Sequence, residues 1–202
     1  MELTQIKQAS LQVYTDCNVT AFPLSCVSIL NHYGLKLYSY TELGFKNPEL
    51  YQICRKYSKD AFLYGSVICY NDEMSMERTR FTLMHELGHF ILHTDDETAA
   101  NQFASHLLAP RCIVEKSKLT NADDVSALFG ISRKAAFFAL DDVKSKGFER
   151  IPIDEKILEH FYSQDLQIYV YHVSECPICG SNIYNSIKDT CLQCKKLSIK
   201  SR

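Results

Sequence analysis

The sequence predicts an α+β protein, and three observations carry that prediction. Stretches rich in β-branched and aromatic residues occur early, at 35–40 and 61–71. Apolar residues then recur at helical spacing through the middle of the chain, and two closely spaced cysteine pairs end it. We therefore expect a small early sheet packed on a helix pair, then further helices, and finally a small cysteine-rich module.

The first third of the chain is expected to alternate helices and short strands. Segment 22–34 is predicted to be a helix ended by its final glycine, and 35–40 a short strand. Asn47 can cap the next helix, with Pro48 in its first turn. Segment 61–71 is predicted to form one or two strands.

Two successive helices are predicted between the early strands and Pro110. Ser75 can cap the first, 76–93, and Pro110 stops the second, which spans about 95–108. Residues at helical spacing in the first helix should face the core: Phe81, Met84, Gly88 and Ile91. This helix pair carries the most informative motif of the sequence.

Two further helices, 121–130 and 132–147, are predicted to meet at a sharp turn. Gly130 suits a left-handed position at the end of the first, and Ser132 can cap the second. The arrangement resembles a helix-turn-helix, but the aspartates that flank it oppose contact with phosphates. We expect a substrate-docking or packing role for these helices. A short helix at 154–163 and a strand at 166–174 follow.

The composition is ordinary for a soluble globular protein and argues against several classes. Hydrophobic residues make up 46% of the 202 residues, and the formal net charge of −2 gives no nucleic-acid signature. The segment MELTQIKQAS lacks the pattern of a secretory signal, and no apolar run approaches the roughly 20 residues that span a bilayer. An odd count of nine cysteines then favours a reducing, cytoplasmic location over a disulfide framework. Five of them are expected to be buried free thiols: Cys17, Cys26, Cys54, Cys69 and Cys112.

The segment HELGH, residues 85–89, predicts a zinc site on the first helix of the pair. His85 and His89 are separated by about 400° of rotation and about 6 Å of rise, so both imidazoles point to one side. Glu86 is offset by about 100° and lies beside the metal, where it can take a proton from water. The alternative is two exposed histidines on an amphipathic helix.

Three residues are candidates for a third zinc ligand. His93 lies about 12 Å from His85 along the helix axis, too far to share one ion easily. Asp95 has the spacing of the extended zincin pattern, but Leu92 stands where that pattern needs glycine. Glu97 begins the second helix and can reach the ion if the two helices pack as an antiparallel pair.

Glu97 has a competing structural role that spacing does not exclude. The segment TDDE fits a capping box in which Thr94 is the cap and Glu97 bonds back to its N–H group. Asn101, one turn after Glu97, could orient a liganding histidine. His106 should face away from the site. Spacing alone therefore leaves the third ligand open.

The run RTRFTLMHELGH and the downstream ETAANQFASHLLAP together resemble the ImmA/IrrE family of metallopeptidases. The matching positions are Arg78, Arg80, Phe81 and Thr82 in the first motif, and Glu97, Ala100, Asn101, Phe103, Ala104, Leu107, Leu108 and Pro110 in the second. Ala109 replaces the methionine that is usual in the family, without expected consequence. The resemblance covers roughly residues 20–145 and implies zinc ligands at His85, His89 and Glu97, with Glu86 as general base.

A second metal site is predicted from the pattern CxxC-x11-CxxC, formed by Cys176, Cys179, Cys191 and Cys194. Four thiolates at this spacing make a closed, structural zinc site, and so small a module needs metal to hold it together. Residues 181–190 between the pairs are expected to form a short hairpin. The tail KKLSIKSR and the nearby Lys188 together carry five basic residues, against one acidic residue, Asp189. This composition is more typical of a solvated tail than of a segment that binds nucleic acid.

The resemblance implies a zinc-dependent endopeptidase with one catalytic zinc. The structural zinc is predicted from the cysteine spacing, and the resemblance does not require it. The implied substrate is a helix-turn-helix repressor of a phage or mobile element. The predicted domains are a zincin-like core at 1–119, a helix-turn-helix-like region at 120–164, and a strand with the ribbon and tail at 165–202. An oxyanion-stabilising residue is not located; the candidates are Tyr70, His160 and His172. The alternatives are a non-catalytic, antitoxin-like binding protein and a DNA-binding regulator.

Overall fold

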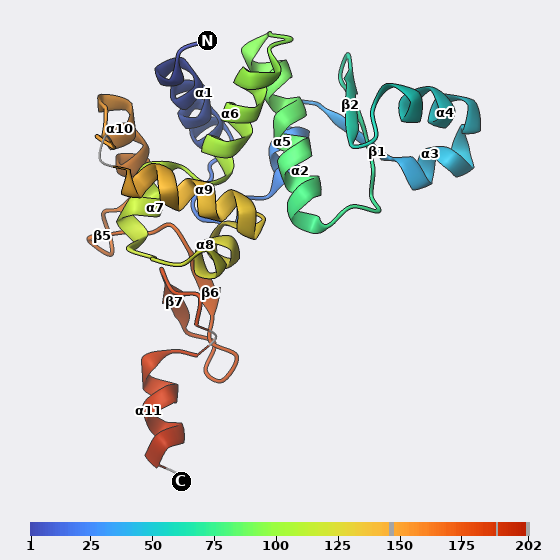
Figure 1. The fold of residues 1–202 in the computed structure, drawn as a ribbon. Coiled ribbons are helices and arrows are strands. Elements are labelled where there is room, and N and C mark those ends of the chain that lie inside the picture. Colours follow the sequence, from blue (N-terminus) through green and yellow to red (C-terminus); the bar gives the residue numbers. More distant parts are fainter. Residues whose placement is uncertain (146–147, 189, 201–202) are drawn as a thin grey trace. The chain divides into compact units, whose positions relative to one another are not determined.

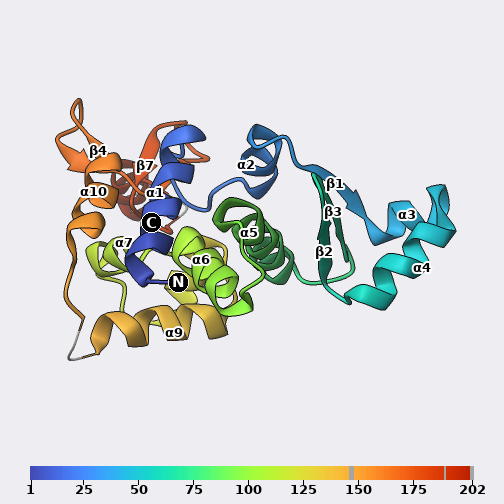
Figure 2. The same cartoon turned by 90° about the horizontal axis from the view of Figure 1, so that it is seen from above.

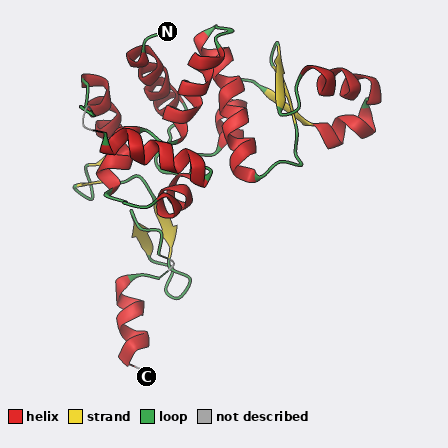
Figure 3. Cartoon of the chain, viewed as in Figure 1, coloured by secondary structure: helices red, strands yellow, loops and turns green. Residues whose placement is uncertain are grey.

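The computed structural model describes residues 1–145, 148–188 and 190–200, and it confirms the predicted α+β class (Figure 1). The described chain forms two compact units. The first comprises Met1–Val19 and Ser25–Pro110, and the second comprises Thr20–Leu24 and the chain from Arg111 onward. Helices dominate, and the strands are short (Figure 3).

In the first unit, several helix boundaries are set by local capping groups. Its helices are α1 (Leu3–Asp16), α2 (Cys26–His32), α3 (Tyr40–Lys46), α4 (Pro48–Tyr57), α5 (Met76–Leu92) and α6 (Glu97–Leu108). The predicted caps Asn47 and Ser75 are confirmed, since each accepts a hydrogen bond from a backbone N–H of its helix. Helix α2 begins later than predicted because Ser25 caps it.

A three-stranded sheet of order β1-β3-β2 confirms the predicted early strands (Figure 2). The strands are β1 (Lys36–Ser39), β2 (Ala61–Tyr64) and β3 (Val67–Tyr70). β1 runs parallel to β3, whereas β2 pairs antiparallel with β3 after a turn at Gly65, which has φ +58°. Strand β2 is therefore an edge of this sheet.

Helices α5 and α6 pack closely side by side and form the centre of the first unit (Figure 1). Gly88 of α5 makes this approach possible: a Cβ there would lie 3.1 Å from Cδ1 of Phe103 and 3.2 Å from Cα of Ala100. Met84 and Leu87 are fully buried as well. Of the residues predicted to face this core, Met84 and Gly88 are buried and Ile91 is half-buried.

Helix α1, which the sequence analysis did not predict, also packs on α6. The phenol of Tyr14 is buried and donates a hydrogen bond to the carbonyl of Leu107 at 2.7 Å. Ile6 and Val13 are fully buried too, but Lys7 and Ser10 lie on the same inward face. Because two inward positions are polar, the apolar periodicity of this helix is weak.

The second unit is built from helices around a cluster of aromatic rings. Its helices before the cysteine cluster are α7 (Arg111–Ser117), α8 (Ala122–Phe129), α9 (Arg133–Lys144) and α10 (Pro152–His160). Phe22 contacts Phe129 and Phe161, with ring centroids 5.0 and 5.2 Å apart. The predicted left-handed Gly130 and the cap Ser132 are confirmed. Helix α7 was not predicted, and residues 146–147 of the predicted second helix lie outside the described residues.

The strand predicted at 166–174 is wrong, because the segment divides between two hairpins. β5 (Ile168–Tyr169) pairs with β4 (Tyr162–Ser163), and β6 (Val173–Glu175) pairs with β7 (Asn182–Tyr184). The Asn185 side chain explains the break: it accepts hydrogen bonds from two backbone N–H groups between β5 and β6 and donates to the carbonyl of Tyr169.

The described part of the basic C-terminal tail is helical, as part of α11 (Leu192–Lys200). The hairpin expected between the cysteine pairs is replaced by the β6–β7 hairpin, which encloses the first pair. Asp189 and residues 201–202 of the tail lie outside the described residues. Within the part of the chain that is described, no helix is both long enough and apolar enough to cross a bilayer.

Candidate metal centres

Helix α5 presents His85 and His89 on one face, as their spacing predicts. The two Nε2 atoms lie 3.0 Å apart, and the side chains are only 14% and 16% exposed. Burial and the neighbouring His89 hold the pKa of His85 below its usual range. The neutral imidazole that this favours is the form that binds metals.

Glu97, the first residue of α6, completes a three-residue cluster with the two histidines. Its Oε2 lies 3.2 Å from Nε2 of His85, and its Oε1 lies 3.4 Å from Nε2 of His89. Tetrahedral zinc with bonds of about 2.0–2.1 Å requires its ligand atoms to be about 3.3–3.4 Å apart. The separations of these side chains therefore fit one zinc ion.

Each histidine is oriented by a hydrogen bond on the far side of its ring. Nδ1 of His85 lies 3.1 Å from Oδ1 of Asn101, and Nδ1 of His89 lies 2.7 Å from the carbonyl oxygen of Thr94. Because the carbonyl oxygens accept, each Nδ1 carries the hydrogen, and each Nε2 presents a lone pair. Two lone pairs and a carboxylate that face one another at about 3 Å are stabilised by a cation between them.

The bond to Thr94 depends on how α5 ends. His93 adopts a left-handed conformation with φ +48°, and the chain turns back after it. Every residue type offers the same backbone carbonyl, so this hydrogen bond could not be predicted from the sequence. The bond from Asn101 is the one that the sequence predicted.

The capping box proposed for Thr94 and Glu97 is wrong, since Asp96 is the cap of α6. Its Oδ1 accepts hydrogen bonds from the backbone N–H groups of Thr98 at 2.9 Å and Ala99 at 3.3 Å. The Thr94 hydroxyl instead accepts from the N–H of Asp96. The Glu97 carboxylate is thus available to the histidines, which removes its competing role.

Glu86 lies next to this cluster and is buried. Burial raises the pKa of its carboxyl, while the charge of His89 and the backbone N–H of Leu63 act in the opposite direction. The charge of Glu97 adds to the rise. A carboxyl that has a raised pKa and lies near metal-binding groups is suited to accept a proton and return it.

The cluster is open to solvent on the side of Glu97, whose side chain is 74% exposed. Three protein ligands and an open side are typical of a catalytic rather than a structural zinc site. His93 and Asp95 are exposed and belong to neither of the metal-binding clusters found among the described residues. His106, predicted to be a surface residue, is half-buried.

The three oxyanion candidates make contacts of other kinds. Tyr70 pairs with Ala61 across the sheet, and burial raises the pKa of its phenol. In the second unit, His160 packs edge-on against Phe161, and Nδ1 of His172 is 2.7 Å from the carbonyl oxygen of Phe22. The contacts of the two histidines are structural, so the oxyanion residue stays unassigned.

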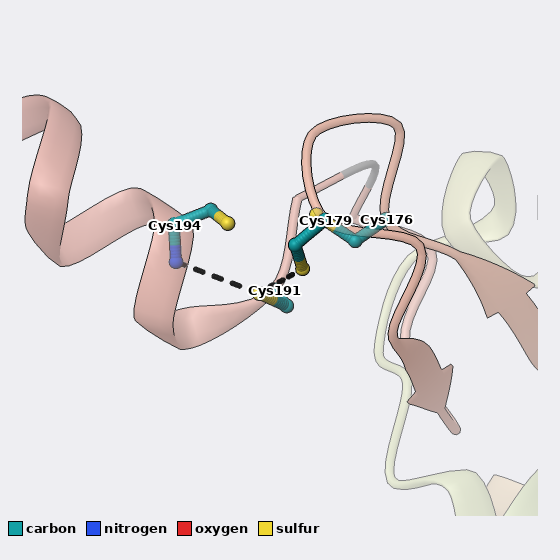
Figure 4. Close-up of side chains that lie close together, drawn as sticks. All are labelled: Cys176, Cys179, Cys191 and Cys194. Carbon is teal, nitrogen blue, oxygen red and sulfur yellow. Dashed lines mark hydrogen bonds between the residues drawn. The ribbon is translucent and has the colours of Figure 1, made fainter.

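The four C-terminal cysteines form a second cluster, in the second unit (Figure 4). Their sulfurs lie within 4.8 Å of one another, and those of Cys179 and Cys191 are 3.7 Å apart. Tetrahedral zinc with Zn–S bonds of about 2.3 Å needs sulfurs about 3.8 Å apart. The cluster therefore fits a closed site. The remaining cysteines are free, and all but the half-buried Cys17 are buried.

Hydrogen bonds from backbone N–H groups lower the pKa of Cys176 to about 6, and the N–H of Cys191 has the largest effect. The hydrogen bond with Cys179 instead raises the pKa of Cys194 to about 12. Without a cation, the four sulfurs thus share protons, because neighbouring thiolates repel one another. A divalent metal removes this conflict by replacing the protons.

The chain was compared with known proteins. Residues 51–141 match the model of the Peptidase_M78 family, described as the IrrE N-terminal-like domain. The matched segment contains β2, β3, α5, α6 and the complete His85, His89 and Glu97 cluster. No curated protein matches the chain. The family match does not include the cysteine cluster.

Proposed function

We propose that the chain is a zinc-dependent endopeptidase, because residues 51–141 match the IrrE N-terminal-like domain family. The observation that carries the proposal is the convergence of His85, His89 and Glu97, with the buried Glu86 beside them. In this proposal the first three residues hold the catalytic zinc, and Asn101 positions His85. Four cysteines hold a second, structural zinc: Cys176, Cys179, Cys191 and Cys194.

Zinc at the first site would polarise the peptide carbonyl and lower the pKa of a water molecule towards about 7. The residues of the chain supply the proton transfers. The Glu86 carboxylate accepts a proton from the attacking water and then donates it to the nitrogen of the leaving amine. Its raised pKa makes the second transfer easier than it would be for a solvated carboxylate. The bonds from Asn101 and the Thr94 carbonyl keep both Nε2 atoms directed at one point.

The proposed substrate is a protein, and more narrowly a helix-turn-helix repressor of a phage or mobile element, which the resemblance implies. The second unit carries its own helix-turn-helix-like pair, α8 and α9, which we propose contributes to substrate docking. The proposed division keeps the peptidase core at 1–119, the helical region at 120–164 and the ribbon at 165–202. We propose a cytoplasmic location, where the free thiols stay reduced.

The proposal is tested by replacing Glu86 with Gln and incubating both proteins, loaded with zinc, with a helix-turn-helix repressor of the proposed substrate class. Glutamine keeps the shape of the side chain and removes its ability to accept a proton. We expect zinc content to be unchanged and cleavage to fall by at least about 100-fold, the usual range for loss of a general base. Equal cleavage by the two proteins would contradict the mechanism.

A further inference from the structure

Three aromatic rings form a row on the surface of the first unit, in which the middle ring is half-buried. We call it the aromatic row: Tyr57, Phe62 and Tyr64. Tyr57 stacks on Phe62 with ring centroids 5.4 Å apart and planes 15° apart. Phe62 stacks on Tyr64 at 6.2 Å and 19°. The two tyrosines are 72% and 75% exposed. Stacked rings left in water are unusual on the surface of a globular protein, because large apolar surfaces are normally buried.

The apolar surface continues along helix α4. Leu50, Ile53 and Tyr57 are spaced by three and four residues and fall within an arc of about 60° on the helix. All three are exposed. The aromatic row is held in place from beneath, because Phe62 packs on a buried cluster that includes Cys54 and Cys69. A rigid apolar surface of this kind marks an interaction site more often than a chance exposure.

Two rings of the aromatic row lie on the strand whose backbone contacts the proposed catalytic base. Phe62 and Tyr64 flank Leu63 on strand β2, and the backbone N–H of Leu63 bonds to the Glu86 carboxylate. In an antiparallel strand the N–H and C=O of one residue point the same way, so this edge of β2 faces the proposed active site. A segment bound along the row would therefore lie against the strand whose backbone contacts the proposed base.

The charges beside the row indicate what kind of segment it suits. Lys56 and Lys59 are exposed on either side of Tyr57. The neighbouring carboxylate of Asp60 is already paired with Arg78 at 2.6 Å. A partner with apolar side chains and nearby acidic residues would thus match both the rings and the lysines.

We propose that the aromatic row, extended by Leu50 and Ile53, is the surface that selects the substrate, and that it binds an apolar, acid-flanked segment of the protein to be cut. This inference rests on the proposed peptidase function. The rings supply apolar contact at low cost in conformational entropy, as aromatic anchors do at other interfaces. Because the contact with α4 lies outside the metal cluster, it determines the affinity for the substrate rather than the rate of peptide-bond cleavage.

A capture experiment tests the surface without depending on cleavage. The full chain with Glu86→Gln is loaded with zinc and immobilised, and a proteome-derived peptide library is passed over it. Retained peptides are identified by mass spectrometry. We expect enrichment of peptides that combine aromatic or branched aliphatic residues with acidic ones. Adding Tyr57→Ala and Tyr64→Ala should reduce their retention at least tenfold, whereas Tyr57→Phe and Tyr64→Phe, which keep the rings, should preserve it.

A matched control removes another exposed apolar pair. Leu166 and Ile168, in the β4–β5 hairpin, are 43% and 42% exposed. The Leu166→Ala and Ile168→Ala double variant should retain the same peptides as its parent. An equal loss in this control would overturn the proposal, and so would unchanged retention after loss of Tyr57 and Tyr64. A homodimer of the free chain that disappears with the two tyrosines would also overturn it, because a second copy would then occupy the row.

Cleavage of the same library by the chain with Glu86 intact separates this proposal from the peptidase function. Tyrosine-dependent capture without any cleavage would support the surface and contradict the peptidase. Cleavage whose rate and sequence preference do not change in the Tyr57→Ala and Tyr64→Ala variant would support the peptidase and contradict the surface. We expect cleavage that loses its preference for apolar residues in that variant. Because both side chains are largely exposed, the variant should keep its unfolding temperature.

Discussion

At the scale of single residues, the groups that orient the histidine rings matter to the site as much as the histidines themselves. Asn101 is the clearest case, since Oδ1 holds Nδ1 of His85 at 3.1 Å while the rest of its side chain is exposed. Replacing Asn101 with Ala should weaken zinc binding at the first site by about 10–100-fold, the usual effect of losing such a partner. Competition with a chelator of known affinity measures this. An unchanged zinc affinity would show that Asn101 does not position the ligand.

The first turn of α6 supplies a second test at this scale. Asp96 bonds two backbone N–H groups there, whereas the Thr94 hydroxyl accepts a single bond. Asp96→Ala should lower the free energy of unfolding by about 1 kcal/mol, and Thr94→Ala by less. Denaturant titration of both variants checks the order. The reverse order would restore Thr94 as the cap and with it the competing role of Glu97.

Whether a residue in this site could be predicted depends on how local its cause is. The spacing of His85 and His89 is a property of one helix, and the structure places them as predicted. The position of Glu97 depends on the approach of a second helix, so spacing left it open until the downstream motif was considered. The Thr94 carbonyl could not be predicted, since any residue type offers the same backbone group.

At the scale of elements, the approach of α5 to α6 decides whether Glu97 reaches the histidines. Gly88→Ala would place a Cβ 3.2 Å from the Ala100 backbone, which cannot move as freely as a side chain. We expect a loss of about 1–3 kcal/mol in stability, the usual cost of overpacking, and weaker zinc binding as the helices separate. Thermal unfolding and zinc affinity measure the two effects.

Gly44→Ala is the matched control, because a Cβ at that position on α3 meets nothing within 4 Å. Alanine is favoured over glycine inside a helix, so this variant should gain up to about 1 kcal/mol. If Gly88→Ala were as well tolerated as Gly44→Ala, close packing of α5 and α6 would not be what assembles the cluster.

Helices that begin at a local capping residue were predicted well, whereas elements whose bounds depend on distant residues were not. Ser75, Asn47 and Ser132 cap helices in the structure as the sequence predicted. Segment 166–174 looked like one strand because its composition suits a strand throughout. Its division into β5 and β6 follows from Asn185, a residue well after the segment, whose side chain bonds the backbone between them.

At the scale of the whole molecule, the two metal clusters lie in different units and should respond differently to chelation. We expect two zinc ions per chain. A mild chelator should remove the ion at the open site first and abolish cleavage, while the closed cysteine site keeps its metal. Zinc content and activity followed together measure this. Simultaneous loss of both ions would contradict the assignment of one open and one closed site.

We propose that His85, His89 and Glu97 hold a zinc ion. This proposal is tested most directly by a crystal structure of the Glu86→Gln chain with an anomalous difference map recorded on both sides of the zinc absorption edge. We predict two zinc peaks. One should lie between Nε2 of His85, Nε2 of His89 and the Glu97 carboxylate, and the other among the four cysteine sulfurs. A map from the zinc-loaded protein with no peak between the two histidines, or with a peak that Glu97 does not contact, would contradict the account.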